Sequence, residues 1–370
     1  MILHVVASGG LYGIERMLAS LLPTLRQAGH PVELLCLGAR GSSAGQVGEL
    51  LESFGIPVRY LPVGRGIRPR DLSSIWKALR GMRPSVIHLH GYKASILVGS
   101  IALLRRIPAM STSHSESLQA PEVTRQLRLE ALVLKRLPVV AAVSTGVAAD
   151  LSRRGVRASK IRVIANGIMD LAPADLAPPR VPARRLAVMG RLIHTKNVHL
   201  LIEAVARLVQ TYPDIRLVVA GSGPAGPMLE SLVGTLGVEN HVHFTGFVVD
   251  VGLILRDCDV FVMPSASEGM PIALLEAMAF GRIIVATAVG GIPSIVENGI
   301  HAMLIPPGDV DALADALIHV LSHGDRAIQM ASAARRRFEA AFVARQMAAA
   351  YAAEYAALTR HKSAFHNFLR

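Results

Sequence analysis

The chain has 370 residues, of which 51% are hydrophobic and 18% are charged, and its formal net charge is +12. This composition excludes a disordered chain, and the length predicts two domains of average size in a packed, soluble protein. The two cysteines, Cys36 and Cys258, are too few for a disulfide framework or a cysteine metal site, which favours a reducing cytoplasm.

The excess positive charge is confined to the first half of the chain. Residues 1–182 hold 23 Lys and Arg against 11 Asp and Glu, whereas residues 183–370 hold 16 of each sign. A basic N-terminal half predicts an anionic partner such as a membrane surface or a lipid diphosphate, with a general solubility role as the alternative. Nucleic acid is not expected, because aromatic residues that could stack on bases are not interleaved with the basic ones.

Short β-rich runs alternate with helical periodicity in the first half, where the helices expected include 14–28 and 71–82. The opening residues "MILHVVASGG" predict a strand rather than a signal peptide, because they lack a basic leader and a cleavage site. No apolar run reaches the roughly 18 to 20 residues of a membrane span. The strands expected in this half are 2–7, 32–37, 57–61, 86–89, 109–112, 139–143 and 161–164.

The proline-rich segment "PADLAPPRVP", residues 173–182, predicts a linker, because prolines remove backbone donors. The Ala-rich stretch 342–360 predicts a helix that crosses back to the first domain. The strands expected after the linker are 186–189, 216–220, 241–244, 259–263, 283–286 and 302–305.

This alternation predicts an α/β fold of two doubly wound, Rossmann-like domains that face each other across a cleft, because parallel strands need crossover helices. The N-terminal domain is expected to hold residues 1–172 and about 350–370, and the C-terminal domain residues 183–349. Open parallel sheets bind ligands at the carboxyl ends of their strands, so the site is expected in the cleft.

The segment "SASEGMPIALLEAMAFG", residues 265–281, carries two acids among small and apolar residues. Pro271 suits a first helical turn and Gly281 a helix end, so Glu268 is expected in a loop and Glu276 inside a helix. A carboxylate in apolar surroundings needs hydrogen-bond donors, and ribose hydroxyls suit Glu276 while sugar hydroxyls suit Glu268. The alternatives are a core acid bonded to backbone or an arginine for Glu276, and an ordinary loop acid for Glu268.

Upstream, "VMGRLIHTKNVHLLIEAVARL" places a strand end at Gly190, with Arg191 and Lys196 flanking the start of a helix. Unpaired N–H groups and two cations at a helix N-terminus bind a diphosphate, although each residue alone also fits a surface charge. A diphosphate site beside hydroxyl acceptors describes a nucleotide-sugar site.

Two other sequence patterns point to different ligands, a dinucleotide and a metal ion, but each is incomplete. "GSGPAG", residues 221–226, fits a dinucleotide-binding fingerprint, but it lies in mid-chain and residue 243 is histidine where an acid is expected. His88, His90 and His114 suggest a metal cluster, but no carboxylate or cysteine completes it, so no metal is expected. His90 and His114 are expected at strand ends that face the cleft, and His88 in the core or at the surface.

Several segments in order resemble family 4 of the retaining glycosyltransferases, which have the GT-B fold. In the second half these are "GRLIHTK", "VVAGSGP", "FTGFV", "DVFVMPSASEGMPIALLEAMAFG" and "VGGIPSIVENG". In the first half they are "GIERMLASLLPTLRQAGH", "RPSVIHLHG", "STSH", "AAVSTGVAADL" and "VIANGI". The resemblance covers the whole chain. Asn197 departs from it, because the family often has glycine at that position.

The resemblance implies roles for individual residues. Arg191 and Lys196, after Gly190, would hold the donor diphosphate and neutralise it as it leaves, so that no catalytic metal and no cofactor are needed. Glu276 would bind the ribose and Glu268 the donor sugar. The remaining residues are Gly269, Met270 and Pro271 along the sugar and phosphate, Phe247 and Val248 beside the base, Gly13 as a loop glycine at the phosphate, His114 facing the reacting sugar, and Gly10, Tyr12, His90 and Tyr92 on the acceptor side.

The function expected is the transfer of a hexose from a nucleotide-diphosphate sugar to an acceptor hydroxyl in cell-surface polysaccharide or glycolipid synthesis. The expected acceptor is lipid-linked or an oligosaccharide at the inner face of a membrane, with the protein peripheral to it. The basic helix around 122–136, with Arg125, Arg128, Lys135 and Arg136, supports a membrane surface or is simply a solvated face. The alternatives are a nucleotide-sugar epimerase or hydrolase of the same fold, or a catalytically silent nucleotide-sugar-binding partner.

Overall fold

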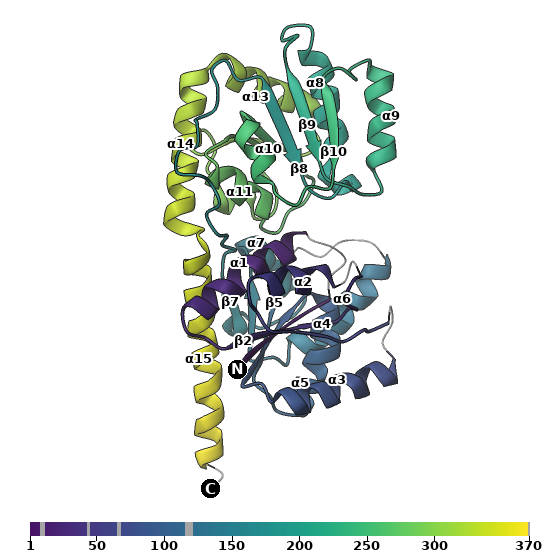
Figure 1. Ribbon diagram of the computed structural model, residues 1–370, viewed down its shortest axis with the longest axis vertical. Helices are drawn as coiled ribbons and strands as arrows, with labels where there is room; N and C mark the ends of the chain where they lie inside the picture. Colours follow the sequence, from purple (N-terminus) through teal and green to yellow (C-terminus); the bar gives the residue numbers. More distant parts are fainter. Residues whose placement is uncertain (8–11, 43–44, 65–67, 115–120, 369–370) are drawn as a thin grey trace. The chain divides into compact units, whose positions relative to one another are not determined.

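The chain divides into two compact units in the computed structural model, which describes all residues except 8–11, 43–44, 65–67, 115–120 and 369–370 (Figure 1). Unit 1 holds Met1–Ile168 and Ala344–Arg370, and unit 2 holds Met169–Val343. The segment 173–182 is thus part of unit 2, and the chain returns to unit 1 at Ala344 rather than at about residue 350. None of the helices among the described residues is long and apolar enough to span a membrane.

Unit 1 is built on a seven-stranded sheet with the order β3-β2-β1-β4-β5-β6-β7. All neighbouring strands are parallel, and the order reverses between β1 and β4, which is the doubly wound arrangement expected. Each strand lies within two residues of the range expected from β-branched runs. The strands are β1 (Ile2–Val6), β2 (Val32–Cys36), β3 (Val58–Tyr60), β4 (Val86–His90), β5 (Ala109–Ser113), β6 (Val139–Ala142) and β7 (Ile161–Val163).

Helices cover this sheet, and the last helix of the chain belongs to it. The first helix packs on both the second and the last, and the leucines along it are fully buried. The helices are α1 (Gly13–Gln27), α2 (Gln46–Ser53), α3 (Pro69–Met82), α4 (Tyr92–Ala94), η1 (Ser95–Gly99), α5 (Ser100–Leu104), α6 (Pro121–Leu134), α7 (Thr145–Arg153), η2 (Ala158–Lys160) and α15 (Ala344–Phe368). The return of α15 to unit 1 agrees with the expected crossing.

Unit 2 repeats the same plan with six parallel strands in the order β10-β9-β8-β11-β12-β13. Its strands are β8 (Arg185–Met189), β9 (Arg216–Ala220), β10 (Val242–Gly246), β11 (Val260–Met263), β12 (Ile283–Thr287) and β13 (Met303–Ile305). Its helices are η3 (His194–Lys196), α8 (Val198–Leu208), α9 (Gly226–Leu236), α10 (Gly252–Asp257), α11 (Ile272–Ala279), α12 (Ile292–Ile295), α13 (Val310–Ser322) and α14 (Gly324–Ala341).

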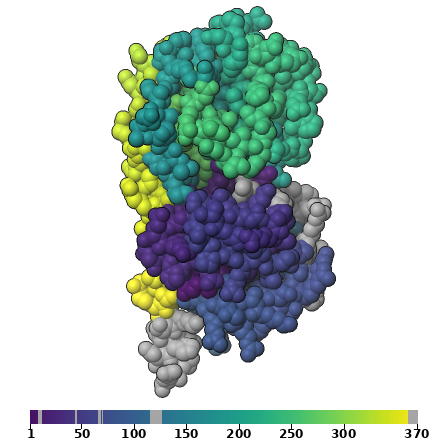
Figure 2. Space-filling model, in the orientation of Figure 1, coloured from purple at the N-terminus to yellow at the C-terminus, as the bar shows by residue number. Residues whose placement is uncertain are grey.

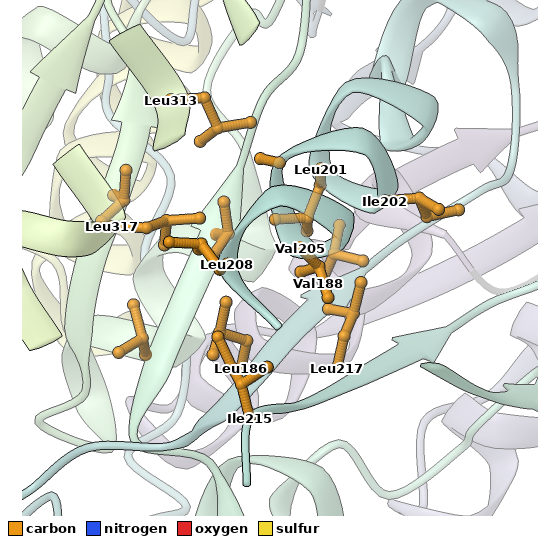
Figure 3. Packing of buried hydrophobic residues seen from close by; sticks show 14 of the residues in the cluster. Leu186, Val188, Leu201, Ile202, Val205, Leu208, Ile215, Leu217, Leu313 and Leu317 are labelled. Atoms are coloured by element: carbon orange, nitrogen blue, oxygen red, sulfur yellow. The ribbon is translucent and has the colours of Figure 1, made fainter. Parts of the chain in front are cut away.

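The core of unit 2 lies between its sheet and helices α8 and α13. Leu201, Val205 and Leu208 of α8 point toward the strands, and Leu313 and Leu317 of α13 close the cluster (Figure 3). The spacing of three and four residues places these side chains on one face of each helix. On the opposite side, α14 packs against α11 and runs along unit 2 in yellow-green (Figures 1 and 2). The central strands β8, β11 and β12 are therefore buried on both faces, which explains their apolar sequences.

Two buried charged residues hold the segment before β8 onto unit 2. Asp259 exposes 1% of its surface, and its carboxylate accepts hydrogen bonds from the backbone N–H groups of Arg180, Arg184 and Arg185, each at 3.0 Å. Arg282 is also buried, and its guanidinium donates to the carbonyl oxygens of Phe280, Cys258 and Ala177 at 2.6, 3.0 and 2.6 Å. The second half of the expected linker is thus fixed by these bonds.

Replacing this carboxylate should destabilise unit 2. In Asp259→Asn an amide N–H₂ group would face backbone donors, so we expect the free energy of unfolding to fall by about 3 kcal/mol. Urea unfolding at neutral pH measures the change. Asp214→Asn is the matched control, because Asp214 also pairs with Arg184 but is 64% exposed, and it should cost less than about 1 kcal/mol. Equal effects of the two variants would contradict the assignment.

Candidate functional site

A cavity lies at the carboxyl ends of β8 and β11. These strands are neighbours on the two sides of the point where the strand order of unit 2 reverses. Loops diverge at such a reversal and leave a crevice, which is where open α/β sheets bind ligands. The residues that line the cavity are Val188, Met189, Gly190, Arg191, Leu192, Lys196, Val198, Val262, Met263, Pro264, Ser265 and Glu268.

An ion pair between Lys196 and Glu268 crosses this cavity. The Lys196 Nζ lies 2.5 Å from Glu268 Oε1, and the Ser265 hydroxyl donates to the same oxygen at 2.7 Å. Thr287 in turn donates its hydroxyl proton to the Ser265 carbonyl oxygen at 2.6 Å. Glu268 is buried, and a buried carboxylate is stable only with such partners. The side chain is therefore fixed in place by a cation and a hydroxyl.

The backbone around Lys196 brings the two loops together. Lys196 ends η3, and Asn197 follows with φ at +50°, in the left-handed region, before α8 begins. Asparagine adopts this conformation more readily than other residues apart from glycine, which explains how it replaces the glycine common in the family. The N–H of Ala266 donates to the Thr195 carbonyl oxygen at 2.8 Å. The loop after β8 is thereby joined to the loop that carries Glu268.

Two glycines allow backbone segments to approach each other beside the cavity. A Cβ on Gly221 would lie 1.8 Å from the Gly190 carbonyl oxygen, and one on Gly290 would lie 1.7 Å from the Glu268 carbonyl oxygen. No side chain fits at either distance, and both residues have positive φ. The "GSGPAG" segment therefore packs against the loop of Gly190 and Arg191, which accounts for its glycines without a dinucleotide.

Four of the expected donor-side residues line the cavity, namely Gly190, Arg191, Lys196 and Glu268. Glu276 is buried on α11 and is not among the lining residues. Arg191, Lys196 and Glu268 thus line the same cavity, whereas Glu276, which was expected there too, is not part of its lining.

The other expected donor-side residues lie outside this cavity as well. Gly269 and Met270 are buried, and Pro271 caps the N-terminus of α11 instead of lying in its first turn. Phe247 and Val248 follow β10, and Phe247 is exposed. These residues follow β10 and the loop of Glu268, as expected, but they do not line the cavity.

In unit 1 the expected acceptor-side residues are placed in different ways. Gly13 is the first residue of α1 rather than a loop residue, and the Tyr12 N–H donates to the Glu15 carboxylate at 2.9 Å. Tyr92 begins α4 and is exposed. Gly10 lies outside the described residues.

The expected histidines lie together in unit 1, with His88 in the core and His90 at the end of β4. His90 is buried, and its two ring nitrogens lie 3.1 Å from His4 Nδ1 and 3.3 Å from His114 Nε2. Its ring therefore contacts that of His114. His4 was not predicted from the sequence to belong to this group. It lies opposite His88 because β1 and β4 are neighbouring strands.

Burial keeps this group of histidines uncharged. It lowers the pKa of His4 to about 3 and that of His114 to about 4. The pKa values of His88 and His90 are also lowered well below the usual value, first by burial and then by the neighbouring histidines. A charged imidazole loses its hydration in such surroundings, so all four rings are neutral at pH 7.

Both halves of the chain match known glycosyltransferase families. Residues 12–170 match Glycosyltransferase Family 4, and residues 180–337 match Glycosyl transferases group 1. The glycogen synthase of Mycobacterium tuberculosis is 30% identical over 293 residues, which span 76% of this chain and 70% of that relative. The chain belongs to the family 4 glycosyltransferases. This glycosyltransferase is also 28% identical over 342 residues to the Escherichia coli UDP-Gal:alpha-D-GlcNAc-diphosphoundecaprenol alpha-1,3-galactosyltransferase, spanning 86% of the chain and 87% of the relative.

Solved structures share the fold of this family 4 glycosyltransferase. Anabaena HepE in complex with UDP-glucose has a TM-score of 0.83 at 22% identity, covering 96% of this chain and 99% of that one. Sucrose-phosphate synthase from Thermosynechococcus elongatus has a TM-score of 0.80 at 21% identity, covering 97% and 99%. With the two doubly wound units, these similarities establish the GT-B fold.

The neutral histidines predict a loss of stability in mild acid. The unfolded chain binds protons on histidines near pH 6.5 while the native rings remain neutral, so the free energy of unfolding falls as the pH drops below about 6.5. Each ring contributes at most about 1.4 kcal/mol per pH unit. Urea unfolding at pH 7.5, 6.5 and 5.5 measures the slope, which His4→Gln should reduce. A flat profile over this range would contradict neutral burial.

Proposed function

We propose that this glycosyltransferase moves a sugar from a nucleotide-diphosphate sugar to an acceptor hydroxyl with retention of anomeric configuration, in the synthesis of a polysaccharide or glycolipid. The observation that carries the proposal is the cavity at the strand reversal of unit 2, where Arg191 and Lys196 lie beside Glu268. The relatives named above, a glycogen synthase and a galactosyltransferase of a diphosphoundecaprenol acceptor, support polymer or lipid-linked products.

The donor diphosphate binds at Arg191 and Lys196 in this proposal. A diphosphate carries more negative charge than Glu268 and competes with it for the Lys196 ammonium group. Released from that contact, the Glu268 carboxylate accepts hydrogen bonds from the donor sugar, while Ser265 keeps it in position. The UDP-glucose in the Anabaena HepE complex supports a uridine donor.

In this proposal the rest of the donor contacts residues outside the cavity lining. Glu276 accepts hydrogen bonds from the ribose hydroxyls, and the base lies along Phe247 and Val248. The backbone of residues 269–271 runs beside the sugar and phosphate. These assignments are supported by the position of α11 directly after Glu268 and of Phe247 directly after β10.

In the reaction the acceptor oxygen attacks the anomeric carbon from the face that the diphosphate leaves. The bond between that carbon and the phosphate oxygen breaks, and a phosphate oxygen takes the acceptor proton. Arg191 and Lys196 stabilise the charge that develops on the leaving diphosphate. Gly13 at the start of α1 and His114 after β5 contact the phosphate and the reacting sugar, and Gly10, Tyr12 and Tyr92 contribute to the acceptor side.

The acceptor is presented at an anionic membrane surface in this proposal. Helix α6 exposes Leu129 and Leu132 to 41% and 52%, with Arg128 on the same helix and Lys135 and Arg136 directly after it, all exposed. Apolar side chains next to basic ones are typical of helices that lie in the headgroup region. The basic first half of the chain supports the same interpretation.

Nucleotide-sugar binding should depend on Arg191. At ~100 times its dissociation constant a donor stabilises the protein by roughly 2.7 kcal/mol, which thermal shift with a panel of nucleotide-sugars detects. Arg191→Ala removes charge-assisted hydrogen bonds and should weaken donor binding about 10- to 100-fold. Lys77→Ala, at an exposed position on α3, is the control and should bind normally. The proposal fails if no nucleotide-sugar stabilises the wild-type protein.

Product analysis separates transfer from the alternatives. With a nucleotide-sugar and a lipid extract, a transferase yields free nucleotide and a glycosylated lipid whose anomeric configuration NMR assigns. A hydrolase yields free sugar without acceptor, an epimerase yields a new nucleotide-sugar, and a silent binding partner yields no product. An inverted anomeric linkage would contradict retention.

Membrane binding should depend on α6. We expect the protein to float with anionic vesicles at low salt and to be released as salt screens the basic residues. The double variant Leu132→Ser, Arg128→Glu should lose most of this binding, whereas Arg326→Glu, an exposed arginine of α14, should retain it. If the wild-type protein stays with the soluble fraction at low salt, the membrane part of the proposal is wrong.

A further inference from the structure

A continuous run of hydrogen-bonding side chains leads through the core of unit 1 to His114. We name it the histidine chain. Its members come from β1, β4, β5, α15 and, for His114, the residue directly after β5. Those before His114 expose no more than 3% of their surface. In order they are Tyr351, Thr112, His88, Tyr355, His4, His90 and His114.

The links of the histidine chain are close enough for hydrogen bonds. Three of them join hydroxyl groups to each other or to His88, at 3.0, 2.7 and 2.6 Å. The Tyr355 hydroxyl then lies 3.5 Å from His4 Nε2. The last two links join His4 Nδ1 to His90 Nε2 at 3.1 Å and His90 Nδ1 to His114 Nε2 at 3.3 Å.

These links couple the tautomers of all four histidines. A neutral imidazole has one N–H donor and one bare nitrogen acceptor, and both nitrogens of His4, His88 and His90 are used within the chain. When every hydroxyl and ring N–H of the chain donates within it, the tautomer of one ring sets that of the next. The protons then all point toward His114 or all point away from it.

The two directions differ in what happens at the end of the histidine chain opposite His114, which is the Tyr351 hydroxyl. If the protons point toward His114, the Tyr351 hydroxyl donates to Thr112, and every hydroxyl proton of the chain has an acceptor. In the opposite direction the Tyr351 proton has no acceptor among the described residues. A buried hydroxyl without an acceptor costs about 1 to 3 kcal/mol, so the direction toward His114 is favoured.

We infer that the histidine chain fixes His114 as the tautomer whose Nε2 accepts from His90 and whose Nδ1–H donates to an oxygen of the sugar substrate. This inference rests on the role proposed above for His114. Tyr355, His4 and His90 are then positioning residues, because they act on the substrate only through His114. An imidazole held in this way offers no bare nitrogen to the substrate, so the acceptor proton goes to the leaving diphosphate and not to His114.

A metal ion is the competing explanation for the same residues. Ligand atoms of His4, His88 and His90 all lie within 4.8 Å of one another. A metal would have to displace the bonds that His88 makes to Tyr355 and Thr112 at 2.6 and 2.7 Å. Hydrogen bonds already occupy every nitrogen of these three rings, so the chain needs no ion.

The wild-type tautomer is read by ¹⁵N NMR of histidine-labelled protein, with His114→Gln to assign the signals. We expect His114 as a neutral ring with the proton on Nδ1 and an accepting Nε2. A proton on Nε2 overturns the inference, and so does one equivalent of tightly bound metal in the purified protein. Neither measurement requires sugar transfer, so failure of the proposed function is distinguishable from failure of the histidine chain.

The role of the chain is tested by two matched variants on α15. Tyr355→Phe cuts the chain between His88 and His4, and we expect mixed tautomers at His114, unchanged nucleotide affinity and about 10-fold lower kcat. In Tyr351→Phe the Thr112 hydroxyl becomes the far end of the chain, and its proton has an acceptor only in the direction toward His88. The same direction stays favoured, so the His114 tautomer and kcat should stay as in the wild type. Equal tautomer spectra for the two variants would overturn the positioning role.

Discussion

The contact between Lys196 and Glu268 is the interaction on which the site in unit 2 depends. It joins the loops that follow β8 and β11, two strands that lie on opposite sides of the reversal in strand order. Loops at a reversal diverge, and without a cross-link their side chains would be free to separate. The ion pair, the Ser265 hydroxyl and the bond from Ala266 to Thr195 hold both loops at one cavity.

In unit 1 the strand order reverses between β1 and β4, and the side chains at this place are uncharged. Between β1 and β4 lie neutral, fully buried rings instead of a half-buried cation and a carboxylate. Charge placed there would have to be paired in the interior, which costs more than neutral hydrogen bonding. The charged side chains of the site therefore lie in unit 2, where the donor diphosphate is proposed to bind. Neutral hydrogen-bonding groups lie at the corresponding place in unit 1, where His114 ends the histidine chain.

Much of this architecture could be predicted from the sequence. All thirteen strands among the described residues lie within two residues of their expected ranges, because buried parallel strands have β-branched, apolar sequences bounded by turn residues. Lys196 and Glu268 were predicted for one site because each follows a strand at the carboxyl edge of the same sheet.

Other features depend on contacts that local patterns do not specify. The segment 173–182 belongs to unit 2 because Asp259, far along the chain, accepts its N–H groups. Tyr355 reaches His88 across 267 residues of sequence, and only the rotation of α15 about its axis brings it there. The position of Glu276 outside the cavity lining likewise follows from the packing of α11, which its uniformly apolar sequence leaves undetermined.

The division of the chain has a consequence for the order in which the protein forms during synthesis. Unit 2 is an insertion between Ile168 and Ala344 of unit 1. Domains fold as the chain emerges from the ribosome, so unit 2 is complete while unit 1 still lacks α15. Until Tyr351 and Tyr355 arrive, the imidazoles of β1 and β4 lack their hydroxyl partners from α15. Nascent unit 1 is therefore a sheet whose core stays open to water until α15 joins it.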